Sequence, residues 1–249
     1  MAERSHKYTY THSSIYHKPR IPAKVTKQLV RELSSKKRPW LFDRHLHFID
    51  FAVYGEQAPV FVNMVRRPVD RFLSHYHFNR IPRKKMAEAM RKLSFKSCVL
   101  SNYTECQTLN AYRTGAVPYF CGQSDVCMTP CQAAVDKAID NINKHYGAIG
   151  LMDHFMQSIA LFEQTLPNMF DNMTEIVSDI LLEDKRENAA RKRYKKDPEV
   201  MKMMRKRMFF ENQLYDFLTK RFHAFLVYYK TDAFLNAKLQ EIVFQNSRR

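Results

Sequence analysis

The cysteines of this 249-residue chain are confined to one short part of it and constrain its fold more than any other feature. They are Cys98, Cys106, Cys121, Cys127 and Cys131. Seven residues separate the first two, and five separate the next two. These gaps suit small loops closed by disulfides better than zinc, whose paired ligands usually lie about two to four residues apart. The alternative is a cytosolic protein with five buried, reduced cysteines.

Two N-glycosylation acceptor sequences favour the oxidising alternative. Asn102-Tyr103-Thr104 lies inside the first cysteine gap, and Asn172-Met173-Thr174 lies further along. A sequon within a candidate disulfide loop is typical of the secretory route. The chain begins with no signal peptide and holds no apolar run long enough to span a membrane. Because a glycosylated protein needs one of these, we expect the true N-terminus to lie upstream.

Charge indicates the kind of partner. Lys and Arg outnumber Asp and Glu by 41 to 25, which gives a formal net charge of +16. Such a surface attracts a polyanion: nucleic acid, an anionic membrane, or a sulfated or uronic polysaccharide. We find no zinc, RRM or helix-turn-helix signature to support nucleic-acid binding. With only 5 Gly, an extended Gly-rich phosphate loop is not expected either.

Apolar periodicity predicts one α/β domain in which strands alternate with helices. Residues 1–39 form a basic segment with a short helix, residues 40–230 form the main domain, and residues 231–249 form a tail. The methionines of residues 201–208 are expected to serve core or interface packing and not metal binding. One expected strand begins at Tyr8, and the others cover residues 46–51, 59–65 and 148–151. The expected helices cover residues 25–33, a segment from Pro68, residues 133–146, a segment capped by Asp153, and residues 199–229.

Two groups of residues follow or precede these strands and are candidates for chemistry. Arg66 follows an apolar strand and precedes a helix that carries Ser74. Ligands of open α/β sheets bind at the carboxyl ends of strands, and a helix N-terminus favours an anion. His45 and His47 precede or begin another strand, where a histidine can act as general base. The alternative is a surface arginine, a helical serine and structural histidines.

The order of several motifs resembles the heparan sulfate and uronyl 2-O-sulfotransferases, from about residue 7 to residue 230. Their pattern is a His-bearing strand followed by N-x-x-R-x-P-x-x-R-x-x-S-x-Y, which Asn63 to Tyr76 match. The resemblance implies a P-loop-like sulfotransferase fold with a mainly parallel sheet flanked by helices. Further matching segments are Pro118–Gly122 (PYFCG), Gly150-Leu151, Leu166–Phe170 (LPNMF) and Glu211–Phe217 (ENQLYDF).

This resemblance implies transfer of a sulfuryl group from 3′-phosphoadenosine 5′-phosphosulfate (PAPS) to the 2-hydroxyl of a uronic acid in a glycosaminoglycan. His45 falls on the general base, and Arg66 with Ser74 falls on the pair that holds the 3′-phosphate of PAPS. His47 is a weaker candidate that contacts the acceptor. The family's disulfides imply the pairs Cys98–Cys106 and Cys121–Cys127, with Cys131 left over. The resemblance also implies an enzyme of the Golgi lumen whose full-length form is anchored in the membrane.

The departures from the family pattern keep a second interpretation open. The phosphosulfate loop, K-x-x-S-T-S after a first strand, is absent. The basic run after Tyr76 replaces the family's acceptor loop, and we expect Arg80, Arg83, Lys84 and Lys85 to contact the acceptor instead. The alternative is a non-catalytic glycosaminoglycan-binding relative. Neither composition nor resemblance fixes whether the protein forms a homo-oligomer.

Overall fold

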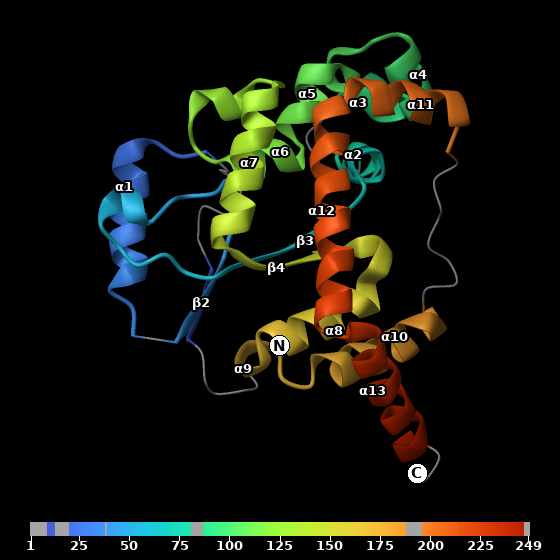
Figure 1. Ribbon diagram of the computed structural model, residues 1–249. Helices are drawn as coiled ribbons and strands as arrows, with labels where there is room; N and C mark the ends of the chain where they lie inside the picture. The colour runs from blue at the N-terminus through green and yellow to red at the C-terminus, as the bar shows by residue number, and fades with distance from the viewer. Residues whose placement is uncertain (1–8, 13–19, 38, 81–86, 188–195, 247–249) are drawn as a thin grey trace.

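The computed structural model describes residues 9–12, 20–37, 39–80, 87–187 and 196–246. It is a mixed α/β structure in which helices surround two small sheets (Figure 1). β1 (Thr9–His12) pairs in parallel with β2 (Trp40–Asp43), and β3 (Phe61–Val65) pairs in parallel with β4 (Tyr146–Leu151). The predicted α/β class and parallel pairing are therefore confirmed. The single sheet is not found, because the described strands form two sheets of two strands each.

The N-terminal sheet has its own helix and core. α1 (Ala23–Ser34), predicted over residues 25–33, buries Val30 and Leu33. These side chains belong to one hydrophobic cluster with Ile49 and Phe51. The strand expected to begin at Tyr8 is present as β1. The basic N-terminal segment thus contributes both a strand and a helix to the fold.

The strand predicted over residues 46–51 is wrong. β2 ends at Asp43, and the segment after it belongs to neither sheet. The backbone amide of Phe48 donates instead to the carbonyl of Tyr119, at 2.8 Å. Phe48 packs into the main hydrophobic cluster, whereas Ile49 and Phe51 pack into the N-terminal one. The apolar run therefore records burial between two clusters, not pairing in a sheet.

The strand–arginine–proline–helix unit is confirmed. β3 ends at Val65, and α2 (Pro68–Phe78) begins with proline, whose missing N–H has no helical partner to lose. The predicted apolar face of α2 is buried against the methionines of a later helix, among them Met201 and Met204. The core role expected for the methionine cluster is thus confirmed. The buried side chains on this face are Val69, Phe72, Leu73 and Tyr76.

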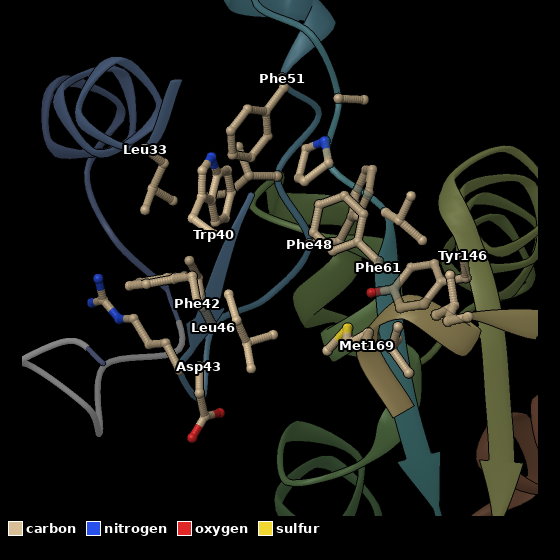
Figure 2. Close-up of a pocket in the computed structure, with 18 of the residues that line it drawn as sticks. Leu33, Trp40, Phe42, Asp43, Leu46, Phe48, Phe51, Phe61, Tyr146 and Met169 are labelled. Atoms are coloured by element: carbon tan, nitrogen blue, oxygen red, sulfur yellow. The ribbon is translucent and has the colours of Figure 1, made fainter. Parts of the chain in front are cut away.

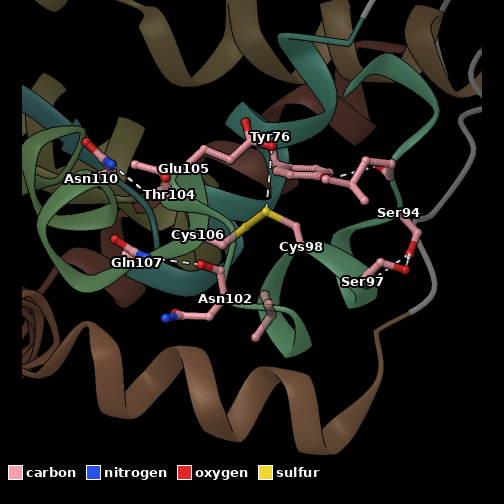
Figure 3. Close-up of a disulfide and its surroundings, with 12 residues drawn as sticks. Tyr76, Ser94, Ser97, Cys98, Asn102, Thr104, Glu105, Cys106, Gln107 and Asn110 are labelled. Carbon is pink, nitrogen blue, oxygen red and sulfur yellow. Dashed lines mark hydrogen bonds between the residues drawn. A yellow bond between two sulfur atoms is a disulfide. The ribbon is translucent and has the colours of Figure 1, made fainter. Parts of the chain in front are cut away.

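Short helices and two disulfides fill the region between α2 and β4. The disulfides are Cys98–Cys106 and Cys121–Cys127, and Cys131 stays free, as predicted. The first closes the loop that carries Asn102 (Figure 3). The helices of this region are α3 (Glu88–Lys92), α4 (Phe95–Leu100), α5 (Thr108–Arg113), α6 (Ala116–Cys121) and α7 (Gln132–His145). Short 3₁₀ turns are η2 (Ala52–Tyr54), η3 (Thr104–Cys106), η4 (Asp125–Met128) and η5 (Met152–His154).

α8 (Phe155–Thr165) follows β4, but Asp153 does not cap it as predicted. The hydroxyl of Ser158 reaches back from α8 and accepts a hydrogen bond from the amide of Leu151, at 2.8 Å. Asp153 lies in η5 and its carboxylate points elsewhere, as described below. The helices α9 (Pro167–Phe170) and α10 (Met173–Glu187) come next.

The predicted last helix is divided in two. α11 (Pro198–Arg207) and α12 (Phe209–Tyr228) meet at Met208, which is buried. α12 runs beside α6, α7 and β4 through the middle of the molecule (Figure 1). In the segment assigned from the sequence to a C-terminal tail, residues 231–246 form α13 (Thr231–Asn246), which packs on α8 and α10. None of the described helices combines the length and the apolar character needed to span a membrane.

Candidate functional site

The carboxyl ends of β2 and β3 bring His45 and Arg66 to the same edge of the fold. His45 follows the last residue of β2 by two positions, and Arg66 directly follows β3. β2 and β3 run in the same direction on opposite sides of a cavity (Figure 2). Both side chains are exposed. His45 and Arg66 thus follow strand ends on opposite sides of that cavity.

His47, unlike His45, is buried. Its side chain is 5% exposed, and burial lowers its pKa to about 4, against an opposing hydrogen bond to the backbone of Gly122. Its carbonyl accepts a hydrogen bond from Gln123, at 2.9 Å. The segment that carries the two histidines is not a strand. His47 is neutral at physiological pH and fixed in place.

Arg66 lies beside the start of α2. The N-cap position of that helix, Arg67, makes no side-chain cap hydrogen bond, and the helix begins at Pro68. The first turn of α2 thus offers its positive dipole end to an anion next to Arg66. Arg66 also borders a small cavity of about 10 Å³ together with Arg71 and Glu211. Ser74 is half-buried two turns along the same helix, and its joint action with Arg66 stays a prediction.

An ion-pair cluster that the sequence did not predict joins the carboxyl ends of β3 and β4. The Nε of Arg67 lies 2.7 Å from Oδ2 of Asp153, which also accepts a hydrogen bond from the hydroxyl of Tyr215 on α12, at 2.9 Å. The nearby carboxylate of Asp153 raises the pKa of Arg67. Arg67 and Asp153 each lie two residues beyond the end of a strand. Parallel pairing of those strands is the signal that could have brought them together.

Glu211 of α12 is a buried carboxylate that holds the start of α6. Its oxygens accept hydrogen bonds from the amides of Ala116, at 2.5 Å, and Val117, at 3.0 Å. Burial raises its pKa to about 7, while these two amides and Arg71 favour the ionised form. A Cβ added to Gly115 would lie 2.2 Å from the carboxylate, so this contact requires glycine. The only sequence signal for Glu211 was its place in the ENQLYDF segment.

Of the four basic residues expected to contact the acceptor, the structure describes only Arg80. Arg80 forms an ion pair with Glu105, and its guanidinium lies 3.3 Å from the centre of the Tyr76 ring. Because its side chain is only 7% exposed, Arg80 supports the first disulfide loop and does not present a surface to a polysaccharide. Arg83, Lys84 and Lys85 lie outside the described residues, so their part in acceptor binding stays a prediction.

The two sequon asparagines are accessible. Asn102 and Asn172 are both exposed, and both have a left-handed backbone, with φ of 52° and 54°. Asparagine tolerates this conformation better than most residues. A glycan on either side chain would extend into solvent, and glycosylation itself stays a prediction.

Comparisons with known proteins agree with the resemblance read from the motifs. The family model described as "Sulfotransferase family" matches residues 3–218. Human uronyl 2-sulfotransferase is 30% identical over 232 residues, which cover 88% of this chain and 56% of that protein. Heparan sulfate 2-O-sulfotransferase 1 of Xenopus laevis is 26% identical over 207 residues, covering 78% of this chain and 57% of its own. The chain spans about half the length of the curated relatives it matches.

Proposed function

Because this chain belongs to the sulfotransferase family, we propose that it takes part in sulfuryl transfer from PAPS to the 2-hydroxyl of a uronic acid in a glycosaminoglycan. The names of its relatives, uronyl 2-sulfotransferase and heparan sulfate 2-O-sulfotransferase, support this choice of acceptor position. The observation that carries the proposal is the placement of His45 and Arg66 at one edge, beside the uncapped start of α2.

His45 is proposed as the general base. Its exposed ring can accept the proton of the acceptor hydroxyl while the sugar oxygen attacks sulfur. When bound, PAPS supplies the sulfuryl group and departs as the 3′,5′-bisphosphate. Arg66 and the first turn of α2 are suited to hold its 3′-phosphate, with Ser74 as a further donor. Holding donor and acceptor in line then supplies much of the rate.

The charge of the protein supports a polyanionic acceptor. A formal net charge of +16 favours encounter with a sulfated or uronic polysaccharide. The disulfides Cys98–Cys106 and Cys121–Cys127 suit an oxidising compartment, and the exposed sequon asparagines suit a glycoprotein. On these grounds we also propose that the protein works in the Golgi lumen.

The experiment is a transfer assay with the purified protein, radiolabelled PAPS and desulfated heparan or dermatan chains. Disaccharide analysis should find the label at the 2-position of a uronic acid. Keratan chains, which carry galactose in place of uronic acid, are the matched control and should stay unlabelled. Retention on heparin without any transfer would favour the non-catalytic relative.

A further inference from the structure

Arg66 lies between two residues that the fold holds in place. Val65 is buried and is the last residue of β3 to pair with β4, opposite Leu151. Arg67 forms the ion pair with Asp153 described above. Within the described part of the chain, the side chain of Arg66 itself has no ion pair or hydrogen bond. Its guanidinium is therefore available to an anion, while the backbone on both sides of it is fixed.

The ion pair of Arg67 with Asp153 continues the parallel pairing of β3 and β4 beyond the strand ends. Each of the two residues lies two positions past the end of its strand. The carbonyl of Arg67 accepts the first hydrogen bond of α2, from the amide of Arg71 at 2.8 Å. Asp153 thus fixes the residue from which α2 starts. Both the place of Arg66 and the direction of the first turn depend on this contact.

Tyr215 of α12 holds Asp153 in turn, and α12 passes beside β4 and α2 (Figure 1). The hydroxyl of Tyr215 donates to Oδ2 of Asp153 at 2.9 Å, the same oxygen that Nε of Arg67 reaches at 2.7 Å. Burial raises the pKa of Tyr215 to about 12, so the hydroxyl remains a donor at neutral pH. Tyr215 also borders the small cavity beside Arg66. Glu211, one turn earlier on α12, borders the same cavity.

We propose that Asp153 and Tyr215 are positioning residues for the anion that Arg66 binds. Tyr215 orients the carboxylate, the carboxylate holds Arg67, and Arg67 sets the backbone of Arg66 and the first turn of α2. A phosphate then meets donors that are already in place, so less conformational entropy is lost on binding. The inference rests on the proposed function, in which this phosphate is the 3′-phosphate of PAPS.

The exposure of the ion pair separates positioning from stability. The side chain of Arg67 is 63% exposed and that of Asp153 is 29% exposed, and such pairs contribute little to stability. Urea unfolding of Asp153→Asn should therefore stay close to wild type. Charge alone predicts tighter anion binding in this variant, because a released Arg67 would add a cation beside Arg66. Positioning predicts weaker binding, so the sign of the change decides between the two roles.

The test is isothermal titration of the purified protein with 3′-phosphoadenosine 5′-phosphate (PAP), the product of PAPS. Asp153→Asn should weaken binding about 5-fold or more. Tyr215→Phe, which removes one hydroxyl and no charge, should weaken it about 3-fold. Asp153→Glu keeps the charge and the acceptor oxygens and should recover part of the loss. If Asp153→Asn does not fold, Tyr215→Phe tests the same chain of contacts.

Two variants are matched controls for these changes. Asp140→Asn breaks the exposed pair with Lys144 on α7 and changes the net charge by the same amount as Asp153→Asn. Tyr228→Phe removes a hydroxyl from α12 at a residue that is 77% exposed. Both should bind PAP like the wild type.

A double-mutant cycle shows whether the effect of Asp153 passes through Arg66. Asp153→Asn should weaken PAP binding in the wild type and much less in Arg66→Ala, because the group that Asp153 positions is then absent. A merely structural role would lower the affinity equally in both backgrounds. In the transfer assay, Asp153→Asn should raise the KM for PAPS and leave kcat almost unchanged, as expected for loss of binding common to the ground and transition states.

The outcomes that overturn the inference are distinct. Tighter binding in Asp153→Asn would mean that Asp153 only offsets the charge of Arg67. Equal weakening with and without Arg66, or in Asp140→Asn, would indicate a general effect of structure or charge. Unchanged affinity in Asp153→Asn, with Arg66→Ala weakened, would reject positioning and keep the proposed cofactor site. If Arg66→Ala itself binds PAP like the wild type, the proposed role of Arg66 fails and the inference fails with it.

Discussion

The carboxylate of Glu211 accepts a hydrogen bond from the amide of Val117, at 3.0 Å, across 94 residues of sequence. It thereby ties α12 to the first turn of α6. α6 in turn holds the segment that carries the two histidines, because the carbonyl of Tyr119 accepts from the amide of Phe48. The buried carboxylate of Glu211 on α12 therefore helps to place His45 and His47.

Glu211→Gln should change how stability depends on pH. Burial raises the pKa of Glu211 from about 4.5 to about 7, so between these values the folded protein binds more protons than the unfolded chain. The contribution of Glu211 to stability is full below this window and is lost as pH rises through it, by about 1.4 kcal/mol per unit of pKa difference. Over this window, urea unfolding at several pH values should show stability falling more steeply with rising pH in the wild type than in Glu211→Gln.

Glu199→Gln, on the exposed first turn of α11, is the matched control and should keep the wild-type profile. An unchanged slope in Glu211→Gln would mean that Glu211 is ionised throughout the window. In that case the amide donors and Arg71 outweigh burial.

His47→Gln should remove a pH dependence of stability whose sign is opposite to that of Glu211. Burial lowers the pKa of His47 from about 6.5 to about 4, so the folded protein binds fewer protons than the unfolded chain in that window. Its contribution is full above pH 6.5 and is lost as pH falls. The two slopes partly cancel where the windows overlap. Acid unfolding should therefore be shallower in His47→Gln, and an unaltered acid limb would contradict the assigned burial.

Local signals were sufficient for some elements and not for others. The run from Pro59 to Val65 followed by Pro68 predicted β3 and α2, because proline and an apolar face act within a few residues. The run over residues 46–51 misled, because its side chains are shared between two clusters formed by distant segments. Apolar runs report burial, and burial alone does not distinguish a strand from a buried connection.

The candidate site shows the same division. Placing His45 and Arg66 near strand ends needed only chain order. Arg80 looked like part of a basic surface because its partner, Glu105, lies 25 residues further along. Glu211 and Gly115 meet only in the folded chain, so no local pattern could have shown that contact.

Arg80→Met should lower stability and leave heparin affinity almost unchanged. The arginine side chain is nearly buried against Tyr76 and Glu105, whereas Glu105 keeps some contact with water. We therefore expect a loss of about 1–3 kcal/mol, below the range for fully buried pairs. Urea unfolding and heparin chromatography measure the two effects.

Lys92→Met breaks the exposed pair with Glu88 and should cost less than about 0.5 kcal/mol. A sharp fall in heparin retention for Arg80→Met would restore Arg80 to the acceptor surface.

Arg66→Ala should weaken binding of PAP, the bisphosphate product of PAPS. Loss of one charge-assisted hydrogen bond costs about 1.5–3 kcal/mol, which corresponds to roughly 10-fold or more in affinity. Isothermal titration of the purified protein with PAP measures it. Arg31→Ala, on the exposed side of α1, removes the same charge away from the site and should bind PAP like the wild type. If Arg66→Ala and Arg31→Ala lose PAP affinity equally, the net charge of the protein, and not a specific contact of Arg66, accounts for the loss.

The choice between His45 and His47 is the most direct test of the proposed chemistry. His45 is exposed at the edge where a sugar hydroxyl can reach it, whereas His47 is buried. Removing a general base typically costs about 10²–10⁴ in rate. His45→Ala should lose transfer activity on that scale, measured with radiolabelled PAPS, while PAP affinity and stability stay close to wild type.

His47→Ala should show the reverse pattern. Truncating a buried ring leaves a void beside Tyr119 and Gly122, so stability should fall more than the rate of transfer by the protein that remains folded. Rates are therefore normalised to the folded fraction, measured by circular dichroism. If normalised His47→Ala is inactive and His45→Ala is active, His47 is the base. The lowered pKa of His47 then describes a base that stays deprotonated across the physiological range.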